Sequence, residues 1–229
     1  MSTEYKITVV NDSPYPQDFY FFQQPAEYVG GINVFTNSIG QGRLLGNSAT
    51  ELNKDQLLFK FEQQYYAGAQ EQKKTPVIGE AQVNPVSQVQ IDLAPNSGQT
   101  NDCTTLITDE GVVHLSDPAV PDSGVQKGAF RIKTKSFNPA QKKYNIGLSS
   151  TDSDGEYRLS SFIEAQPNQY TDVKPKLKFY VSVGTFTPGT VVDFTTSSAS
   201  AAECDANDGT LKFKVTYKLD GTWDVEKMT

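Results

Sequence analysis

Few side chains in this sequence are suited to nucleophilic catalysis or to binding a transition metal. His114 is the only histidine, and the two cysteines, Cys103 and Cys204, stand far apart. A nucleophilic triad needs a histidine within hydrogen-bond reach of a serine or cysteine. The chain contains neither a Gly-x-Ser-x-Gly elbow nor a His-Glu-x-x-His pair. The sequence therefore assigns no catalytic residue, and we expect no cofactor.

The cysteines raise the question of a disulfide or a metal. One histidine and two distant thiols make no zinc pattern. No export signal is visible at the N-terminus, so free thiols in a reducing compartment are favoured. In an oxidising compartment the two would instead close one long disulfide loop.

Two acidic loops are weak calcium candidates. One holds Asp152 and Asp154, and the other holds Asp205 and Asp208, each beside a glycine. Calcium prefers six to eight oxygens, often in the EF-hand spacing. The first loop has no third ligand at the right offset, and the second lacks the distal acid. Asp-Gly at a hairpin corner is therefore favoured over a metal site.

A glycine-rich run, Gly40 to Gly46, superficially resembles a dinucleotide-binding loop. Such a loop works only between a parallel strand and a helix whose N-terminus holds the pyrophosphate. Neither element is indicated around this run, so it is expected to form a turn between strands.

Aromatic side chains are the best candidates for a binding site. Tyrosine and tryptophan combine a stacking surface with a polar group, which suits sugars and flat organic molecules. The candidate ligand-binding residues are Tyr20, Phe22, Tyr65, Tyr66, His114 and Trp223. Packing inside the core is the competing interpretation for each of the aromatic residues.

Basic side chains alternate along three segments. Arg131, Lys133 and Lys135 share one face, and the other two sets are Lys174, Lys176, Lys178 and Lys212, Lys214, Lys218. If these strands were neighbours, they would form a basic surface for an anion. A solvated face that discourages edge pairing is the favoured interpretation.

Alternation of apolar and polar residues is the dominant pattern of the chain, and it predicts the elements that position these side chains. Phe213 and Val215 alternate with lysines before Asp220-Gly221, a typical tight hairpin turn. We expect strands at 4–10, 17–23, 31–37, 56–66, 76–83, 86–92, 104–108, 111–115, 130–135, 143–149, 157–163, 176–181, 189–195 and 211–219. One or two helical turns are expected within 49–64, and helix is otherwise nearly absent.

These patterns predict an all-β fold. We expect an antiparallel β-sandwich of jelly-roll or Greek-key type with about fourteen strands. The 229 residues are expected to form a single domain over 1–229, with two smaller β domains over 1–98 and 99–229 as the alternative.

Composition and charge indicate which partners and which cellular location to expect. The net charge of −7 disfavours DNA or RNA as a partner. No apolar run is long enough to span a membrane as a helix. Without a visible signal peptide, the expected location is cytoplasmic; a non-classical secretion route and a trimmed chain are the alternatives.

Two functions of different classes follow. The first is a non-catalytic binding protein whose aromatic site takes a neutral ligand, such as a carbohydrate, or a protein partner. The alternative is a cofactor-independent isomerase or cyclase that holds an apolar small molecule in an aromatic-lined β cavity. Self-assembly into a homo-oligomer is a third possibility, because amphipathic hairpins such as 210–226 would permit it.

Overall fold

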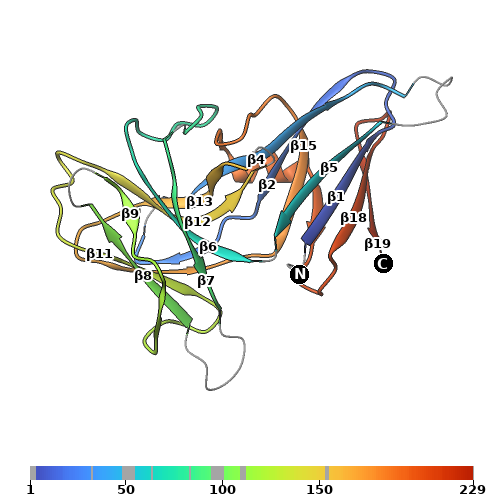
Figure 1. Ribbon diagram of the computed structural model, residues 1–229. Helices are drawn as coiled ribbons and strands as arrows, with labels where there is room; N and C mark the ends of the chain where they lie inside the picture. The colour runs from blue at the N-terminus through green and yellow to red at the C-terminus, as the bar shows by residue number, and fades with distance from the viewer. Residues whose placement is uncertain are drawn as a thin grey trace.

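The structure is a computed structural model that describes residues 4–31, 33–47, 55–62, 64–82, 84–93, 101–108, 112–152 and 155–228. Within these ranges the chain forms nineteen strands and one short helix. The all-β prediction is confirmed, and the strands are more numerous than expected. They build two lobes, which lie side by side in Figure 1.

The terminal lobe holds both ends of the chain (right half of Figure 1). One of its sheets has the strand order β19-β18-β1-β5, in which the first and last parts of the chain meet as the parallel pair β1 and β18. Facing this sheet are β17, β15, β2 and β4. The bounds are β1 Glu4–Asn11, β2 Gln17–Gln23, β4 Phe35–Leu44, β5 Gln56–Glu62, β15 Lys178–Val183, β17 Ala202–Asp205, β18 Lys212–Tyr217 and β19 Trp223–Met228.

The central lobe is built from the middle of the chain together with β3. One sheet has the order β10-β8-β11-β14-β3, with β9 beside β8, and it faces β13, β12, β6 and β7. The bounds are β3 Glu27–Val29, β6 Tyr65–Glu71, β7 Ser87–Ile91, β8 Asn101–Ile107, β9 His114–Leu115, β10 Val120–Asp122, β11 Phe130–Thr134, β12 Tyr144–Thr151, β13 Tyr157–Glu164 and β14 Tyr170–Lys174.

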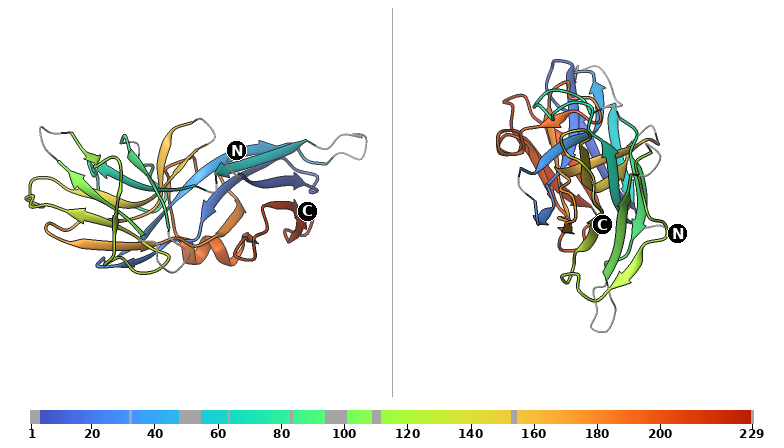
Figure 2. Two further views of the ribbon diagram at one scale, coloured as in Figure 1. Left: turned by 60° about the horizontal axis from the view of Figure 1, so that its bottom comes forward. Right: turned by 90° about the vertical axis from the view of Figure 1, so that its left-hand side faces the viewer.

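One sheet of nine strands runs through both lobes in the order β17-β15-β2-β4-β13-β12-β6-β7, with β16 (Val191–Val192) beside β4. Strand β4 makes the link, because its residues 38–44 pair with β2 while Phe35 and Thr36 pair with β13. Figure 2 shows the resulting elongated shape, with the blue and red segments at one end and the green and yellow segments at the other.

Each lobe encloses its own hydrophobic core. The first core, in the terminal lobe, includes Phe19, Phe21, Phe179 and Phe213. The second core, in the central lobe, includes Phe130 and other side chains between residues 26 and 173. The first core thus draws on residues before 60 and after 176, so chain order does not separate the two cores.

The predicted C-terminal hairpin is present, and its alternation works as expected. Phe213 and Val215 of β18 are buried in the first core, and Gly221 adopts φ +81° at the turn into β19. The hydroxyl and backbone N–H of Thr222 donate to Asp220 at 2.6 and 3.0 Å. The Asp-Gly pair therefore supplies both the positive φ and the hydrogen bonds that fix this turn.

The turn expected at Gly40–Gly46 is wrong, because residues 40–44 continue strand β4. A Cβ on Gly40 would lie 2.9 Å from the Phe59 ring, and one on Gly42 would clash with the Leu57 side chain. The glycines let β4 pass closely under the side chains of β5, a role that glycine often has in strands.

Other boundaries also differ from expectation. The strand expected at 76–83 is reduced to a single bridge between Ala81 and Thr190. The strand expected at 56–66 is present as β5 over Gln56–Glu62, and β6 begins at Tyr65. The helical turns expected within 49–64 are absent from 56–62, and 48–54 lie outside the described residues. The expected strand at 31–37 starts only at Phe35, and 189–195 splits into β16 and the start of the helix.

That helix, α1 (Phe194–Ala199), is capped by Asp193, whose carboxylate accepts a hydrogen bond from the Thr196 N–H at 3.2 Å. It covers the face of β2 and β15 that points away from the first core, where the Phe194 ring lies 5.4 Å from the ring of Tyr180. No described helix has the length and apolarity needed to cross a membrane.

The cysteines are both free and lie in different lobes. Cys204 belongs to the first core, whereas Cys103 lies on β8 of the central lobe. Burial raises the pKa of the Cys204 thiol to about 12. Burial also raises the pKa of the Cys103 thiol, so both thiols act as packing groups in this structure.

Candidate functional site

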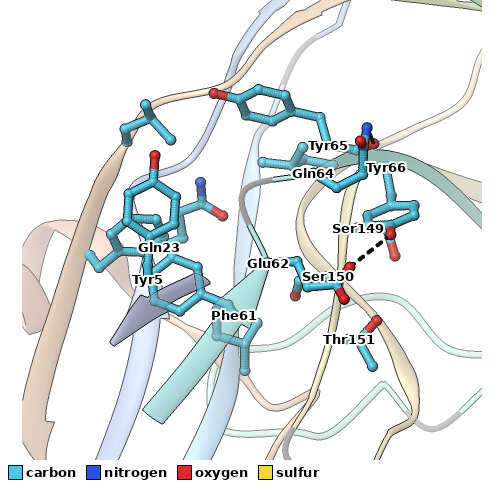
Figure 3. Close-up of a pocket in the computed structure, with 14 residues that line it drawn as sticks. Tyr5, Gln23, Phe61, Glu62, Gln64, Tyr65, Tyr66, Ser149, Ser150 and Thr151 are labelled. Atoms are coloured by element: carbon cyan, nitrogen blue, oxygen red, sulfur yellow. Dashed lines mark hydrogen bonds between the residues drawn. The ribbon is translucent and has the colours of Figure 1, made fainter. Parts of the chain in front are cut away.

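A narrow cleft lies where the two lobes meet. Its walls come from β1, β5 and β15 of the terminal lobe and from β6 and β12 of the central lobe (Figure 3). We call it the tyrosine cleft, and its enclosed space is about 50 Å³. The lining side chains that matter for recognition are Tyr5, Phe61, Glu62, Tyr65, Tyr66 and Ser150.

One wall is aromatic and rigid. Tyr5 and Phe61 are cross-strand partners on β1 and β5, and their rings stack 5.0 Å apart at 15°. The ring of Phe179 lies 4.1 Å from that of Phe61. Because Tyr5 and Phe179 are also buried in the first core, this wall is held by the packing of the terminal lobe.

The opposite wall carries two consecutive tyrosines of β6. The Tyr66 hydroxyl donates to the Glu62 carboxylate at 3.0 Å, a contact that joins the two lobes across the cleft (Figure 3). Burial raises the pKa of Tyr65 to about 12. Desolvation, followed by the hydrogen bond to Glu62, raises the pKa of Tyr66 to about 12. Both phenols are therefore neutral at ordinary pH.

Amide and hydroxyl groups complete the lining. Gln64 Nε2 donates to the Ile91 carbonyl at 2.8 Å, while its Oε1 accepts from Gln90 at 3.1 Å. The Gln64 side chain is thus fixed in place. Ser150 Oγ is buried against the cleft and has no hydrogen-bond partner. A buried hydroxyl without a partner is costly unless a bound group satisfies it.

The structure brings together two of the six residues that the sequence proposed for ligand binding, Tyr65 and Tyr66. Tyr20 and Phe22 are buried beneath α1 in a cluster with Tyr180 and Val192. The two faces of β2 are therefore both covered by protein, and Tyr20 and Phe22 serve as packing residues.

The remaining two candidate residues, Trp223 and His114, do not line the tyrosine cleft. Trp223 packs against the first core, with its ring 6.0 Å from that of Phe19, and its indole N–H donates to the Ser200 carbonyl at 2.8 Å. His114 is exposed on β9 of the central lobe. The six candidate ligand-binding residues are therefore divided among separate parts of the molecule.

The acidic loops show why a metal is disfavoured there. Asp208 pairs with Lys227, and that hydrogen bond holds the pKa of the Asp208 carboxyl well below its usual range. Asp205 accepts from the Asn207 N–H at 2.9 Å and pairs with Lys178 at 3.2 Å. Each of these carboxylates thus already faces a lysine ammonium.

The first acidic loop is similar. Asp152 accepts from the Glu156 N–H at 2.9 Å and from Arg158 at 3.0 Å, whereas Asp154 lies outside the described residues. Within the described part of the chain, no three His, Cys, Asp or Glu side chains group as metal ligands.

The lysine-bearing strands do become neighbours in one case, since β11 and β14 pair antiparallel. However, Arg131 forms an ion pair with Asp172 at 2.6 Å, and Lys133 pairs with Asp122 at 2.9 Å. Acids on adjacent strands therefore balance Arg131 and Lys133, which lowers the attraction of this surface for an anion.

Comparisons with known proteins found no match among family models, curated proteins or solved structures. The functional argument therefore rests on the geometry of the cleft.

The shifted tyrosines give a prediction about pH. The ordinary tyrosine pKa is 10.0, and Tyr65 and Tyr66 reach about 12 in the folded chain. Between these values the folded protein holds protons that the unfolded chain releases, so stability falls as pH rises from about 10 through 12. Near-ultraviolet absorbance should show tyrosines that ionise late, one fewer in Tyr66→Phe. A single ionisation step near pH 10 for all tyrosines would contradict this.

Proposed function

We propose that this chain is a non-catalytic binding protein whose tyrosine cleft takes the hydroxyl-bearing edge of a neutral carbohydrate. The observation that carries the proposal is the Ser150 hydroxyl, which is buried without a partner in a cleft whose lining includes the neutral phenols of Tyr65 and Tyr66 and the carboxylate of Glu62. Sugar hydroxyls both donate and accept hydrogen bonds, so they match hydroxyl, phenol and carboxylate groups at once.

The size of the cleft supports partial entry of the ligand. A buried water needs roughly 10–15 Å³ of such space, so a cleft of about 50 Å³ admits a few hydroxyl groups and not a whole ring. Tyr157 is the cross-strand partner of Thr151 at the rim and is 48% exposed. The sugar ring would rest against the tyrosines at this rim while its hydroxyls point inward.

The charges of the cleft favour a neutral ligand. Glu62 contributes the one carboxylate, and its Oε2 is oriented by the Tyr66 hydroxyl. No lysine or arginine belongs to the described lining of the cleft. An anionic sugar or a phosphate would therefore meet Glu62 without a compensating cation.

The alternative function, an isomerase or cyclase, gains no support from this geometry. A cavity that encloses a small organic molecule typically measures about 300–1,000 Å³. The aromatic-lined cleft is much smaller, with an enclosed space of about 50 Å³. We therefore retain the binding protein as the proposal.

A glycan array followed by calorimetry on the best neutral glycan tests the proposal. We expect Tyr66→Ala to weaken binding about tenfold or more, because a stacked ring adds about 0.5–1.5 kcal/mol beyond its buried area and about 1.4 kcal/mol is a factor of ten. Tyr15→Ala is the matched control, since Tyr15 is 69% exposed in the turn between β1 and β2. It should bind as the wild type does.

Two results would overturn the proposal. One is an array on which the folded protein binds no glycan, including the case in which a pull-down recovers only a protein partner. The other is binding that Tyr66→Ala leaves unchanged while its thermal unfolding matches that of Tyr15→Ala.

A further inference from the structure

Strand β5 forms a free edge of its four-stranded sheet. It is the last strand in the order β19-β18-β1-β5, beside β1 (Figure 1). Among the described residues, β5 pairs with β1 alone, and its backbone bonds to no other segment. The Lys6 N–H on β1 donates to the Leu211 carbonyl at 2.8 Å, on the side of β18. Because hydrogen-bonded and non-hydrogen-bonded pairs alternate, the N–H of its cross-strand partner Lys60 points to the free edge, as does that of Leu58.

A slit lies along this edge, between β5 and β4 of the facing sheet. It has a volume of about 160 Å³, and its lining includes Phe21, Ile39, Phe59, Lys60 and Phe61. The rings of Phe21 and Phe59 stack 5.1 Å apart in the first core. A buried water needs roughly 10–15 Å³ of such space, so the slit has room for apolar side chains of an added strand. We call it the edge slit.

The opposite edge of the same sheet is closed. Lys227 of β19 points inward, as the cross-strand partner of Phe213, and it pairs with Asp208. The Trp223 indole N–H donates to the Ser200 carbonyl at 2.8 Å. An inward-pointing charge is a common protection of an edge strand against further pairing. Strand β5 instead turns three apolar side chains toward the first core, namely Leu57, Phe59 and Phe61.

The charges on the outer face of the sheet indicate which strand fits beside β5. Lys60, Lys6 and Lys212 are cross-strand neighbours in one row across β5, β1 and β18. Like charges directly opposite each other destabilise a sheet. Lys6 pairs with Glu4 at 3.5 Å, whereas Lys60 is exposed and forms no ion pair with a described residue. A carboxylate placed beside Lys60 by an added strand would offset the repulsion within this row.

We propose that β5 binds an extended peptide as a fifth strand, and that this peptide carries an acidic residue between two apolar residues. Successive side chains of a strand point to opposite faces. When the carboxylate lies beside Lys60 on the outer face, the two neighbouring side chains point inward and enter the edge slit. Main-chain hydrogen bonds to the free edge supply the affinity, and the side chains supply the specificity, as is usual for strand addition. Lys60 disfavours a strand with a basic residue at the same position.

The proposed peptide site is separate in its chemistry from the glycan site. The edge slit shares Ile39, Phe61 and Thr151 with the tyrosine cleft, but the described lining of the slit includes neither Tyr66 nor Ser150. The peptide site therefore does not depend on the carbohydrate proposal.

Nuclear magnetic resonance of the backbone amides tests the peptide site. The probes are three capped peptides of seven residues, the length of β5, whose central residue is glutamate, glutamine or lysine between two valines. We expect the glutamate peptide to shift the Leu58 and Lys60 N–H signals in a saturable manner and to slow their hydrogen exchange. The Phe59 N–H, which faces β1, should change little. The lysine peptide should bind about tenfold more weakly than the glutamate peptide, with the glutamine peptide between them.

A charge reversal provides the variant for this test. Lys60→Glu should reverse the order, so that the lysine peptide binds most tightly. Lys214→Glu is the matched control, because Lys214 lies on the outer face of the same sheet but on β18, which β1 separates from β5. This control should leave the order of the three peptides unchanged, as should Tyr66→Ala.

Three outcomes would overturn the peptide site. The first is that none of the three peptides shifts the Leu58 or Lys60 N–H signal. The second is an order of affinities that Lys60→Glu leaves unchanged. The third is that these two signals shift with protein concentration alone, which would make a second copy of the chain the occupant of the edge. If the glycan array is blank while the glutamate peptide binds, the tyrosine cleft proposal fails and the peptide site stands.

Discussion

Phe213→Ala is expected to lower the free energy of unfolding by about 3–5 kcal/mol, the usual cost of emptying a buried phenylalanine site. Phe213 is 1% exposed in the first core, and its strand joins the two ends of the chain through β1. The cavity would open between the two sheets of the terminal lobe, where neighbours on both sides are held by their own strands. Collapse around it would therefore be limited.

Leu219→Ala is the matched control for this change. Leu219 lies at the tip of the same hairpin and is 73% exposed, so its removal should cost less than about 0.5 kcal/mol. Chemical denaturation of both variants measures the difference. Equal costs would mean that the lysine-bearing face of β18, and not the Phe213 face, is turned toward the interior.

Strand β18 is the kind of strand that alternation predicts most directly, because one of its faces is buried and the other meets water. Lysines occupy its solvent-facing positions and alternate with Phe213 and Val215, which are buried. Strands β17 and β10 were missed because their residue types are unusual for strands. Ala202–Asp205 has little intrinsic preference for strand and exists because it pairs with β15. Pro121 in β10 is tolerated because β10 is an edge strand.

Burial on the second face of a strand could not be predicted from alternation. Tyr20 and Phe22 point away from the first core, but the alternation of the sequence gives no information about what covers them. The cover is α1, which lacks a helical apolar stripe and depends on the Asp193 cap and on the Phe194 ring. Residues that suggested a ligand surface are therefore packing residues there.

The tyrosine cleft was only half predictable. The adjacent aromatic residues Tyr65 and Tyr66 indicate a possible binding surface in the sequence, whereas no local sequence pattern distinguishes Tyr5 or Ser150. Tyr5 reaches the cleft through its register with Phe61, and Ser150 through the pairing of β12 with β13 beyond an irregularity after Leu148. Such contacts depend on long-range register, which local pattern does not encode.

The charge of the lysine-bearing strand faces also could not be predicted from local sequence. The sequence shows which cations share a strand face, but the acids that neutralise them come from other strands. Asp172 on β14 and Asp122 on β10 reach Arg131 and Lys133 only because β10, β8, β11 and β14 lie in that order. A basic surface on one strand thus becomes a balanced network in the sheet.

Within that network, Asp172→Ala is expected to cost about 3–5 kcal/mol, the range found when one partner of a buried ion pair is removed. Asp172 accepts two hydrogen bonds from Arg131, at 2.6 Å from Nε and 2.9 Å from Nη2. The side chains are only 7% and 14% exposed. The guanidinium would remain largely buried, with Asp122 at 3.9 Å as its remaining carboxylate.

An exposed pair provides the control. Lys214 and Glu226 lie 3.4 Å apart across β18 and β19, with side chains 39% and 50% exposed, so Glu226→Ala should cost less than about 1 kcal/mol. Salt should weaken the Lys214–Glu226 contribution and leave most of that of Asp172, because screening acts mainly on solvated charges. Denaturation at low and high salt measures both effects. If Asp172→Ala and Glu226→Ala lost equal stability, water would be solvating Arg131 adequately without Asp172. The Arg131–Asp172 pair would then behave as a surface ion pair.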